Sequence, residues 1–105
     1  MSRGERESGE PPAGAGAVVR IFAIRNKKGL HARAAAKFVQ TVEKFDAEVR
    51  VTRGAETVGG TSIMGLLMLA ASPGTSITVE AIGREALEVI EALSALIGAR
   101  FGEDD

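Results

Sequence analysis

The single histidine of the chain, His31, lies in a sequence context that suits phosphoryl chemistry. It follows a turn that contains Gly29, and a segment with helical spacing begins directly after it, with Arg33 two residues further on. The first amides of a helix have no partner within the helix and carry partial positive charge. A neutral imidazole at this position is therefore a nucleophile beside ready-made anion-binding groups. A phosphoryl group on the ring could bind the amides of Ala32 and Arg33 and the Arg33 guanidinium.

Simpler interpretations of these residues stay open on spacing alone. His31 can be a capping residue at the surface, with Arg33 as a solvated charge. A metal site is not expected, because the sequence has no cysteine, no second histidine and no carboxylate cluster near His31. Phosphoryl transfer depends mainly on positioning and charge stabilisation, so we expect no metal or other cofactor in this chain.

A second group of residues, Gly-Gly-Thr-Ser-Ile-Met-Gly at positions 59–65, places hydroxyls at the start of another helix. Thr61 or Ser62 can cap this helix by accepting a hydrogen bond from a first-turn amide. A phosphate at this position would be electrostatically favourable, and an unmodified cap is the alternative. The apolar residues that follow predict either an exposed contact surface or core packing. These residues are Ile63, Met64, Leu66, Leu67 and Met68.

The spacing of apolar residues predicts the elements that position both groups. Short β-branched or alternating segments predict strands at residues 18–25, 47–53, 56–59 and 76–81. Apolar residues three or four positions apart, or a short apolar segment after a cap, predict helices at residues 32–45, 62–69 and 84–100. Strands with one polar face and helices with one apolar stripe bury each other when all helices lie on one side of the sheet. The expected fold is therefore α+β, a two-layer sandwich of four antiparallel strands and three helices in the order β-α-β-β-α-β-α.

Length and composition restrict the remaining possibilities. The 105 residues allow one domain, residues 18–102, between a polar arm at 1–17 that we expect to be disordered and a solvated tail at 103–105. A net charge of −1 argues against a nucleic-acid binder held by phosphate neutralisation. No apolar run approaches the roughly 20 residues of a membrane-spanning helix, so membrane insertion is not expected. The absence of cysteine fits a reducing cytoplasm.

Both motifs resemble those of the phosphocarrier HPr family of the bacterial phosphoenolpyruvate-dependent phosphotransferase system. Residues 29–33, Gly-Leu-His-Ala-Arg, resemble the active-site motif of the family. Residues 62–65, Ser-Ile-Met-Gly, resemble its regulatory-serine motif, and the separation of the two motifs also agrees. The resemblance spans about residues 18–102 and implies an open-faced β-sandwich.

The resemblance also implies roles for individual residues. His31 would accept a phosphoryl group on Nδ1 from enzyme I and pass it to a histidine of an enzyme IIA domain, with the assistance of Arg33. The chain would be a monomeric, cytoplasmic phosphocarrier of sugar transport with a covalent phosphohistidine intermediate, rather than an independent turnover enzyme. Ser62 would be the target of an ATP-dependent HPr kinase. The partner-docking residues would be Ile63, Met64, Leu66 and Leu67.

The sequence departs from the family pattern in two places. Ala34 occupies the position of a proline that would favour the first helical turn, so we expect a slightly less rigid site. The polar arm at 1–17 replaces a shorter N-terminus. With Ala34, the motif also resembles that of HPr-like proteins of nitrogen-type regulatory branches. In a carrier of that kind, phosphorylation of His31 or Ser62 would switch partner binding without sugar transport. A third interpretation is a small metabolite-binding domain in which His31 only binds an anion.

Overall fold

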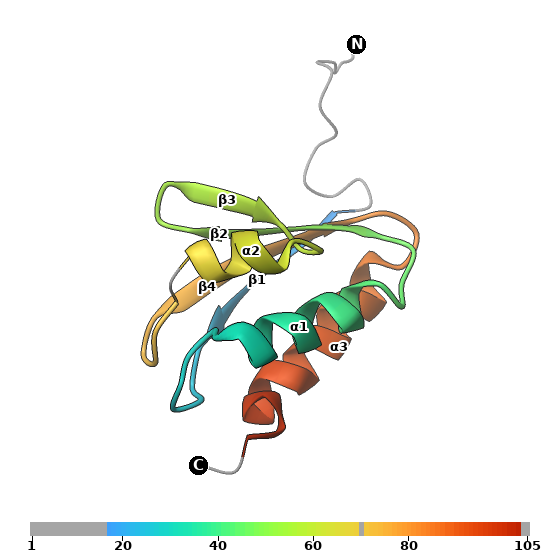
Figure 1. Cartoon of the computed structure of the whole chain (residues 1–105). Coiled ribbons are helices and arrows are strands. Elements are labelled where there is room, and N and C mark those ends of the chain that lie inside the picture. The colour runs from blue at the N-terminus through green and yellow to red at the C-terminus, as the bar shows by residue number, and fades with distance from the viewer. Residues whose placement is uncertain (1–16, 70, 104–105) are drawn as a thin grey trace.

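Antiparallel strands and amphipathic helices alternate along the chain in the computed structural model, which describes residues 17–69 and 71–103 (Figure 1). The strands are β1 (Ala17–Ala23), β2 (Glu48–Arg53), β3 (Glu56–Gly59) and β4 (Ser76–Ile82). The helices are α1 (Ala32–Val42), α2 (Ile63–Met68) and α3 (Ala86–Gly98), and a short 3₁₀ turn, η1 (Arg100–Gly102), follows them. This order is the predicted one.

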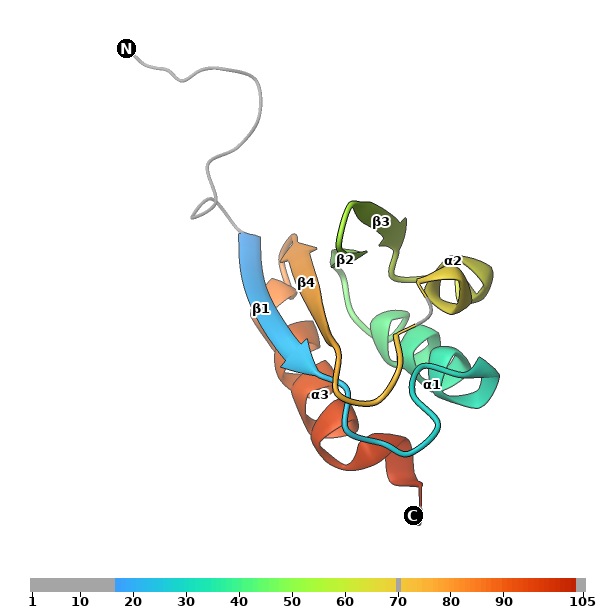
Figure 2. The same cartoon turned by 90° about the vertical axis from the view of Figure 1, so that its left-hand side faces the viewer.

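The four strands form one antiparallel sheet in the order β1-β4-β2-β3. Side chains of β2 and β4 alternate between the core and the open face, as expected for strands with one wet face. The buried members are Val49, Val51, Ile77, Val79 and Ala81. Figures 1 and 2 show the helices gathered on one side of this sheet. The fold is therefore an open-faced two-layer sandwich, as predicted.

Helices α1 and α3 each bury one apolar stripe with residues three or four positions apart. The stripe of α1 begins with the small residues Ala34 and Ala35, both fully buried, and continues through Phe38. The stripe of α3 includes Ile90 and Leu93, which are also fully buried. These side chains and the inward residues of the sheet form one hydrophobic core, and the start of α1 lies at its edge.

The ends of all three helices differ from the predicted ones, by one residue at each end of α2 and by two or three residues in α1 and α3. Helix α1 stops at Val42 rather than Phe45, because the chain tightens into a turn in which the Phe45 amide donates to the Val42 carbonyl at 3.1 Å. Helix α3 begins at Ala86 and ends at Gly98, with Ala99 as its C-cap, and the last predicted residue, Arg100, begins η1 instead. Tertiary contacts decide these ends, whereas apolar spacing decides the elements.

The prediction of a solvated tail is wrong at Glu103. Its side chain is 15% exposed and lies against Asn26 and His31, because η1 turns the chain back toward α1. Residues 104–105 and 1–16 lie outside the described residues, and Ala17, assigned to the arm, is the first residue of β1. Among the residues that the structure describes, no helix is long and apolar enough to cross a membrane.

Candidate functional site

The chain approaches the histidine through a turn that requires glycine at position 29. Gly29 has a φ of +68°, and a Cβ atom at this position would lie 2.5 Å from the Ala71 carbonyl oxygen. Residues other than glycine rarely adopt this backbone conformation. The next amide, that of Leu30, donates to the same Ala71 oxygen at 2.9 Å, and the Leu30 side chain is buried. Backbone contacts therefore place His31 at the start of α1.

His31 is the N-cap of α1, and both of its ring nitrogens have partners. Nδ1 accepts a hydrogen bond from the Arg33 amide at 3.2 Å. Because a backbone N–H can only donate, Nδ1 carries a lone pair, and the proton of the neutral ring lies on Nε2. Nε2 contacts the Glu103 carboxylate, to which it donates. The His31 side chain is 27% exposed, so a partner protein can reach it.

Two residues at the histidine had no counterpart in the sequence prediction. Asn26 is fully buried, and its Nδ2 donates to the Gly29 carbonyl at 2.6 Å and to the Glu103 carboxylate at 3.2 Å. Asn26 belongs to the same turn as Gly29, whose amide donates to the Asn26 carbonyl at 3.2 Å. Glu103 lies 72 positions after His31, and no local pattern in the sequence could connect the two residues.

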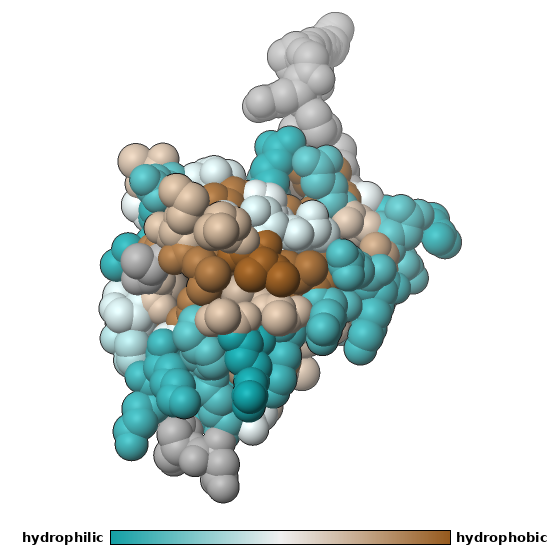
Figure 3. Space-filling model, viewed as in Figure 1, coloured by the Kyte–Doolittle hydropathy of each residue, from teal (hydrophilic) through white to brown (hydrophobic). Residues whose placement is uncertain are grey.

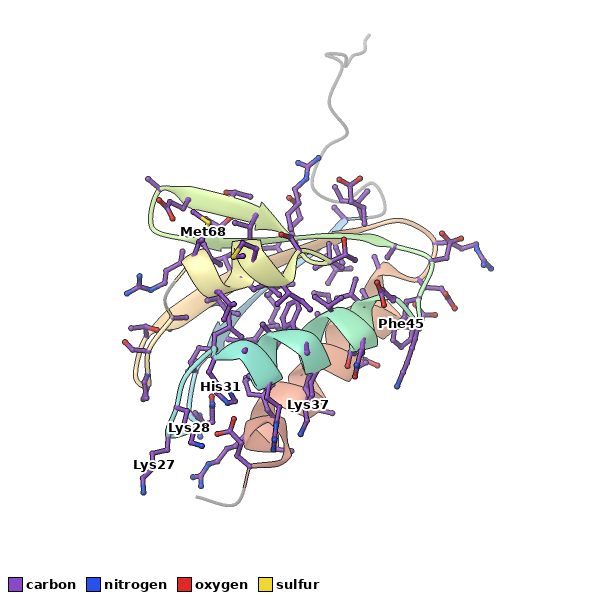
Figure 4. The ribbon with its side chains drawn as sticks, viewed as in Figure 1. Lys27, Lys28, His31, Lys37, Phe45 and Met68 are labelled. Carbon is purple, nitrogen blue, oxygen red and sulfur yellow. The ribbon has the colours of Figure 1, made fainter. Side chains whose placement is uncertain are left out.

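Three exposed cationic residues lie close to the histidine along the chain. Arg33 is exposed in the first turn of α1, which contains no acidic residue. Lys27 and Lys28 are exposed in the preceding turn, and Figure 4 shows them at the same end of the molecule as His31. The N-terminus of α1 adds partial positive charge. The structure therefore joins the predicted pair through the Arg33 backbone amide, which contacts the His31 ring at a helix N-terminus of the kind that binds anions.

Ser62 caps α2, and Thr61, the other predicted candidate, does not. The Ser62 Oγ accepts a hydrogen bond from the Gly65 amide at 2.9 Å. A Cβ atom at Gly65 would lie 2.9 Å from that oxygen, so the glycine permits the close cap. The Ser62 side chain is exposed. His31 caps α1 and Ser62 caps α2, and these two helices pack against each other. Within the described chain, the hydrogen bonds given for the two side chains have no partner in common, so the two residues form separate sites.

The apolar residues of α2 divide between the surface and the core. Ile63, Met64 and Met68 are 42%, 68% and 69% exposed, and we call these three residues the α2 patch. Figure 3 shows hydrophobic surface gathered around α2. Leu67 is partly buried beside the patch. Leu66 is fully buried, so its predicted role in docking is wrong: it lies on the side of the helix that packs into the core.

Known proteins are similar to this chain in both sequence and fold. Residues 18–99 match the family model described as "PTS HPr component phosphorylation site". The phosphocarrier protein HPr of Neisseria meningitidis serogroup A is 51% identical over 82 residues, which cover 78% of this chain and 92% of that protein. The phosphocarrier protein NPr of Shewanella violacea is 40% identical over 84 residues, which cover 80% and 92%. The crystal structure of HPr-C-His from Thermoanaerobacter tengcongensis superposes with a TM-score of 0.80 at 41% identity, covering 84% of this chain and 99% of that chain. The chain therefore belongs to the HPr family of phosphocarrier proteins of the phosphotransferase system.

Proposed function

We propose that His31 is the phosphoryl-carrying residue, with enzyme I as the donor and an enzyme IIA domain as the acceptor. The observation that supports this most directly is the state of the ring. Nδ1 carries a lone pair at the N-terminus of α1, while Nε2 is engaged by Glu103. Family membership supports a phosphocarrier activity, and this geometry favours Nδ1 as the atom that carries the group.

The transfer step balances without a metal or cofactor. The Nδ1 lone pair forms the bond to phosphorus, and the bond from phosphorus to the donor breaks with its electron pair remaining on the donor. Nε2 keeps its proton, so the ring becomes positively charged. Transfer to the acceptor repeats the exchange in the opposite direction, with His31 as the leaving group.

The groups around the ring have defined roles in this proposal. The Arg33 amide, which now donates to Nδ1, is placed to donate to a phosphoryl oxygen once Nδ1 is occupied. The Ala32 amide precedes the first intrahelical bond, from the Ala35 amide to the His31 carbonyl at 2.8 Å, and can serve in the same way. The Arg33 guanidinium supplies a fixed positive charge for the phosphoryl oxygens.

Docking and regulation belong to α2 in this proposal. The α2 patch, with Leu67 at its margin, serves as the contact surface for enzyme I and the enzyme IIA domain. Ser62 serves as the target of an HPr kinase, since its hydroxyl is exposed at a helix N-terminus where phosphate is electrostatically favoured. We further propose that the protein acts as a monomer in the cytoplasm.

A nitrogen-type regulatory carrier is the second candidate. The similarity to the NPr of Shewanella violacea covers as much of the chain as the similarity to HPr proteins does. Ala34 also stands where most of the family has proline, and its side chain is fully buried in α1. The two candidates differ in their donor. Faster phosphorylation of His31 by a sugar-type than by a nitrogen-type enzyme I supports sugar transport, and the reverse order supports the regulatory branch.

Phosphorylation by enzyme I tests the role of His31. The chain is incubated with phosphoenolpyruvate and enzyme I, and its intact mass is measured. We expect wild type to gain one phosphoryl group that is lost in acid and kept in base, whereas His31→Ala gains none. Ser62→Ala is the matched control, because it removes the other predicted phosphorylation site and should still be labelled. Labelling of His31→Ala would contradict the proposal.

A further inference from the structure

The last described residues of the chain form a turn that brings a carboxylate to the histidine. Arg100, Phe101 and Gly102 have left-handed backbone conformations, with φ values of +56°, +56° and +73°. Arg100 and Phe101 carry a Cβ atom, so this conformation is strained for both residues. The Gly102 amide donates to the Ala99 carbonyl and the Glu103 amide to the Arg100 carbonyl, both at 2.9 Å. We call residues 99–103 the C-terminal turn.

Core packing and a hydrogen bond from α1 help to hold the C-terminal turn on the domain. The Phe101 side chain is buried in the core, and the Lys37 Nζ donates to the Phe101 carbonyl at 2.6 Å. Lys37 belongs to α1, the helix that His31 caps. The turn is therefore attached to the element that carries the histidine. This attachment determines where Glu103 lies relative to His31.

Asn26 holds the Glu103 carboxylate in place. Its Nδ2 donates both to the Gly29 carbonyl at 2.6 Å and to Glu103 at 3.2 Å. If the amide were reversed, its oxygen would face two acceptors, so the hydrogen-bond network determines its orientation. Asn26 is fully buried, where the low dielectric strengthens such bonds.

The geometry points to Glu103, held by Asn26, as a positioning residue for the phosphoryl acceptor, an inference that rests on the proposed function of His31. A carboxylate that accepts from one ring nitrogen keeps the proton there and leaves the lone pair on the other nitrogen. Glu103 on Nε2 therefore presents Nδ1 as the nucleophile and fixes the plane of the ring. It also lies against the positive charge that the ring gains when the bond from Nδ1 to phosphorus forms.

Nitrogen NMR of the full chain tests this role without any phosphoryl donor. His31 is the only histidine, so ¹⁵N labelling gives one set of imidazole signals. With the ring neutral, we expect Nδ1 to show the shift of an unprotonated nitrogen and Nε2 that of a protonated one. In Glu103→Gln the two shifts should move toward each other as the second tautomer becomes populated. Glu91→Gln removes an exposed carboxylate of α3 and is the matched control, with both shifts as in wild type.

Transfer kinetics give a second readout. Glu103→Gln should lower the rate of His31 phosphorylation by about tenfold, because a neutral acceptor replaces a charged one. The concentration of enzyme I that gives half-maximal rate should stay unchanged, since Glu103 acts on the ring rather than on the docking surface. An unaltered melting temperature confirms that the variant is folded.

Two results would overturn the inference. One is a wild-type spectrum with the proton on Nδ1, and the other is Glu103→Gln with wild-type shifts and rate. Either result leaves the proposed function standing if labelling still requires His31. Conversely, the predicted shifts in a chain that enzyme I fails to label would overturn the proposed function and leave the tautomer assignment intact.

Discussion

At the scale of single residues, three separate parts of the chain determine the state of His31. The turn at Gly29 delivers it, the Arg33 amide binds Nδ1, and Glu103 binds Nε2. The two ring contacts have opposite polarity, since one partner only donates and the other accepts. The neutral ring is therefore held in one tautomer, in which the nitrogen beside the helix N-terminus carries the lone pair.

Arg33 supplies charge that the backbone amides cannot, so its removal should slow transfer. We expect Arg33→Ala to lower the rate of His31 phosphorylation by about tenfold to a hundredfold, the value of one charge-assisted hydrogen bond. Arg33→Lys should recover part of the rate, because it keeps the charge and loses the planar fork. Stopped-flow or quenched labelling with enzyme I measures both variants. An Arg33→Ala rate equal to that of wild type would show that the guanidinium does not assist phosphoryl transfer.

At the scale of elements, the N-termini of two helices organise the chemistry that we propose. Helix α1 is capped by a histidine and α2 by a serine, and each cap accepts an amide hydrogen bond through its side chain. Apolar spacing predicts α1, because periodicity reflects which face is buried, whereas α2 is predicted from a short apolar segment that follows a capping hydroxyl. Apolar spacing did not predict the end of α1 at Val42 or the 3₁₀ turn after Gly98, because tertiary hydrogen bonds and burial decide those positions.

A negative charge at position 62 should slow phosphorylation of His31. Asp and Asn both cap helices well, so Ser62→Asp and Ser62→Asn keep the cap and differ mainly in charge. We expect Ser62→Asp to be labelled more slowly than Ser62→Asn, because the added charge repels acidic contacts of enzyme I (a property that the family resemblance implies). Labelling rates measured side by side test this. Equal rates in the two variants would show that charge at the α2 cap does not regulate the site.

At the scale of the whole molecule, the fold brings the C-terminal turn to His31, which lies 72 positions earlier in the chain. Strain at Arg100 and Phe101 costs about 1–2 kcal/mol per residue. Burial of the Phe101 side chain contributes about 1.5–3 kcal/mol, and the Lys37 bond to its carbonyl adds to this. Burial therefore offsets the strain. The motif around His31 could be recognised in the sequence, whereas the Glu103 contact could not, since it depends on how the end of α3 packs.

The α2 patch should matter for partner binding and little for stability. Met64 is 68% exposed, so Met64→Glu should leave the melting temperature within a few degrees of wild type. It should raise the concentration of enzyme I needed for half-maximal labelling by about tenfold, as loss of a docking side chain does. Leu87→Glu is the matched control, because Leu87 is 50% exposed on α3 and outside the patch. The same effect in both variants would contradict docking at α2.

The most direct test of the central claim is to identify the atom that carries the phosphoryl group. Wild-type chain labelled with ¹⁵N is phosphorylated by enzyme I, and scalar coupling between phosphorus and nitrogen is measured on its one imidazole ring. We predict that phosphorus couples to Nδ1 of His31 as the directly bonded nitrogen while Nε2 keeps its proton. Phosphorus bonded to Nε2, or to an oxygen with no coupling to nitrogen, would contradict the account.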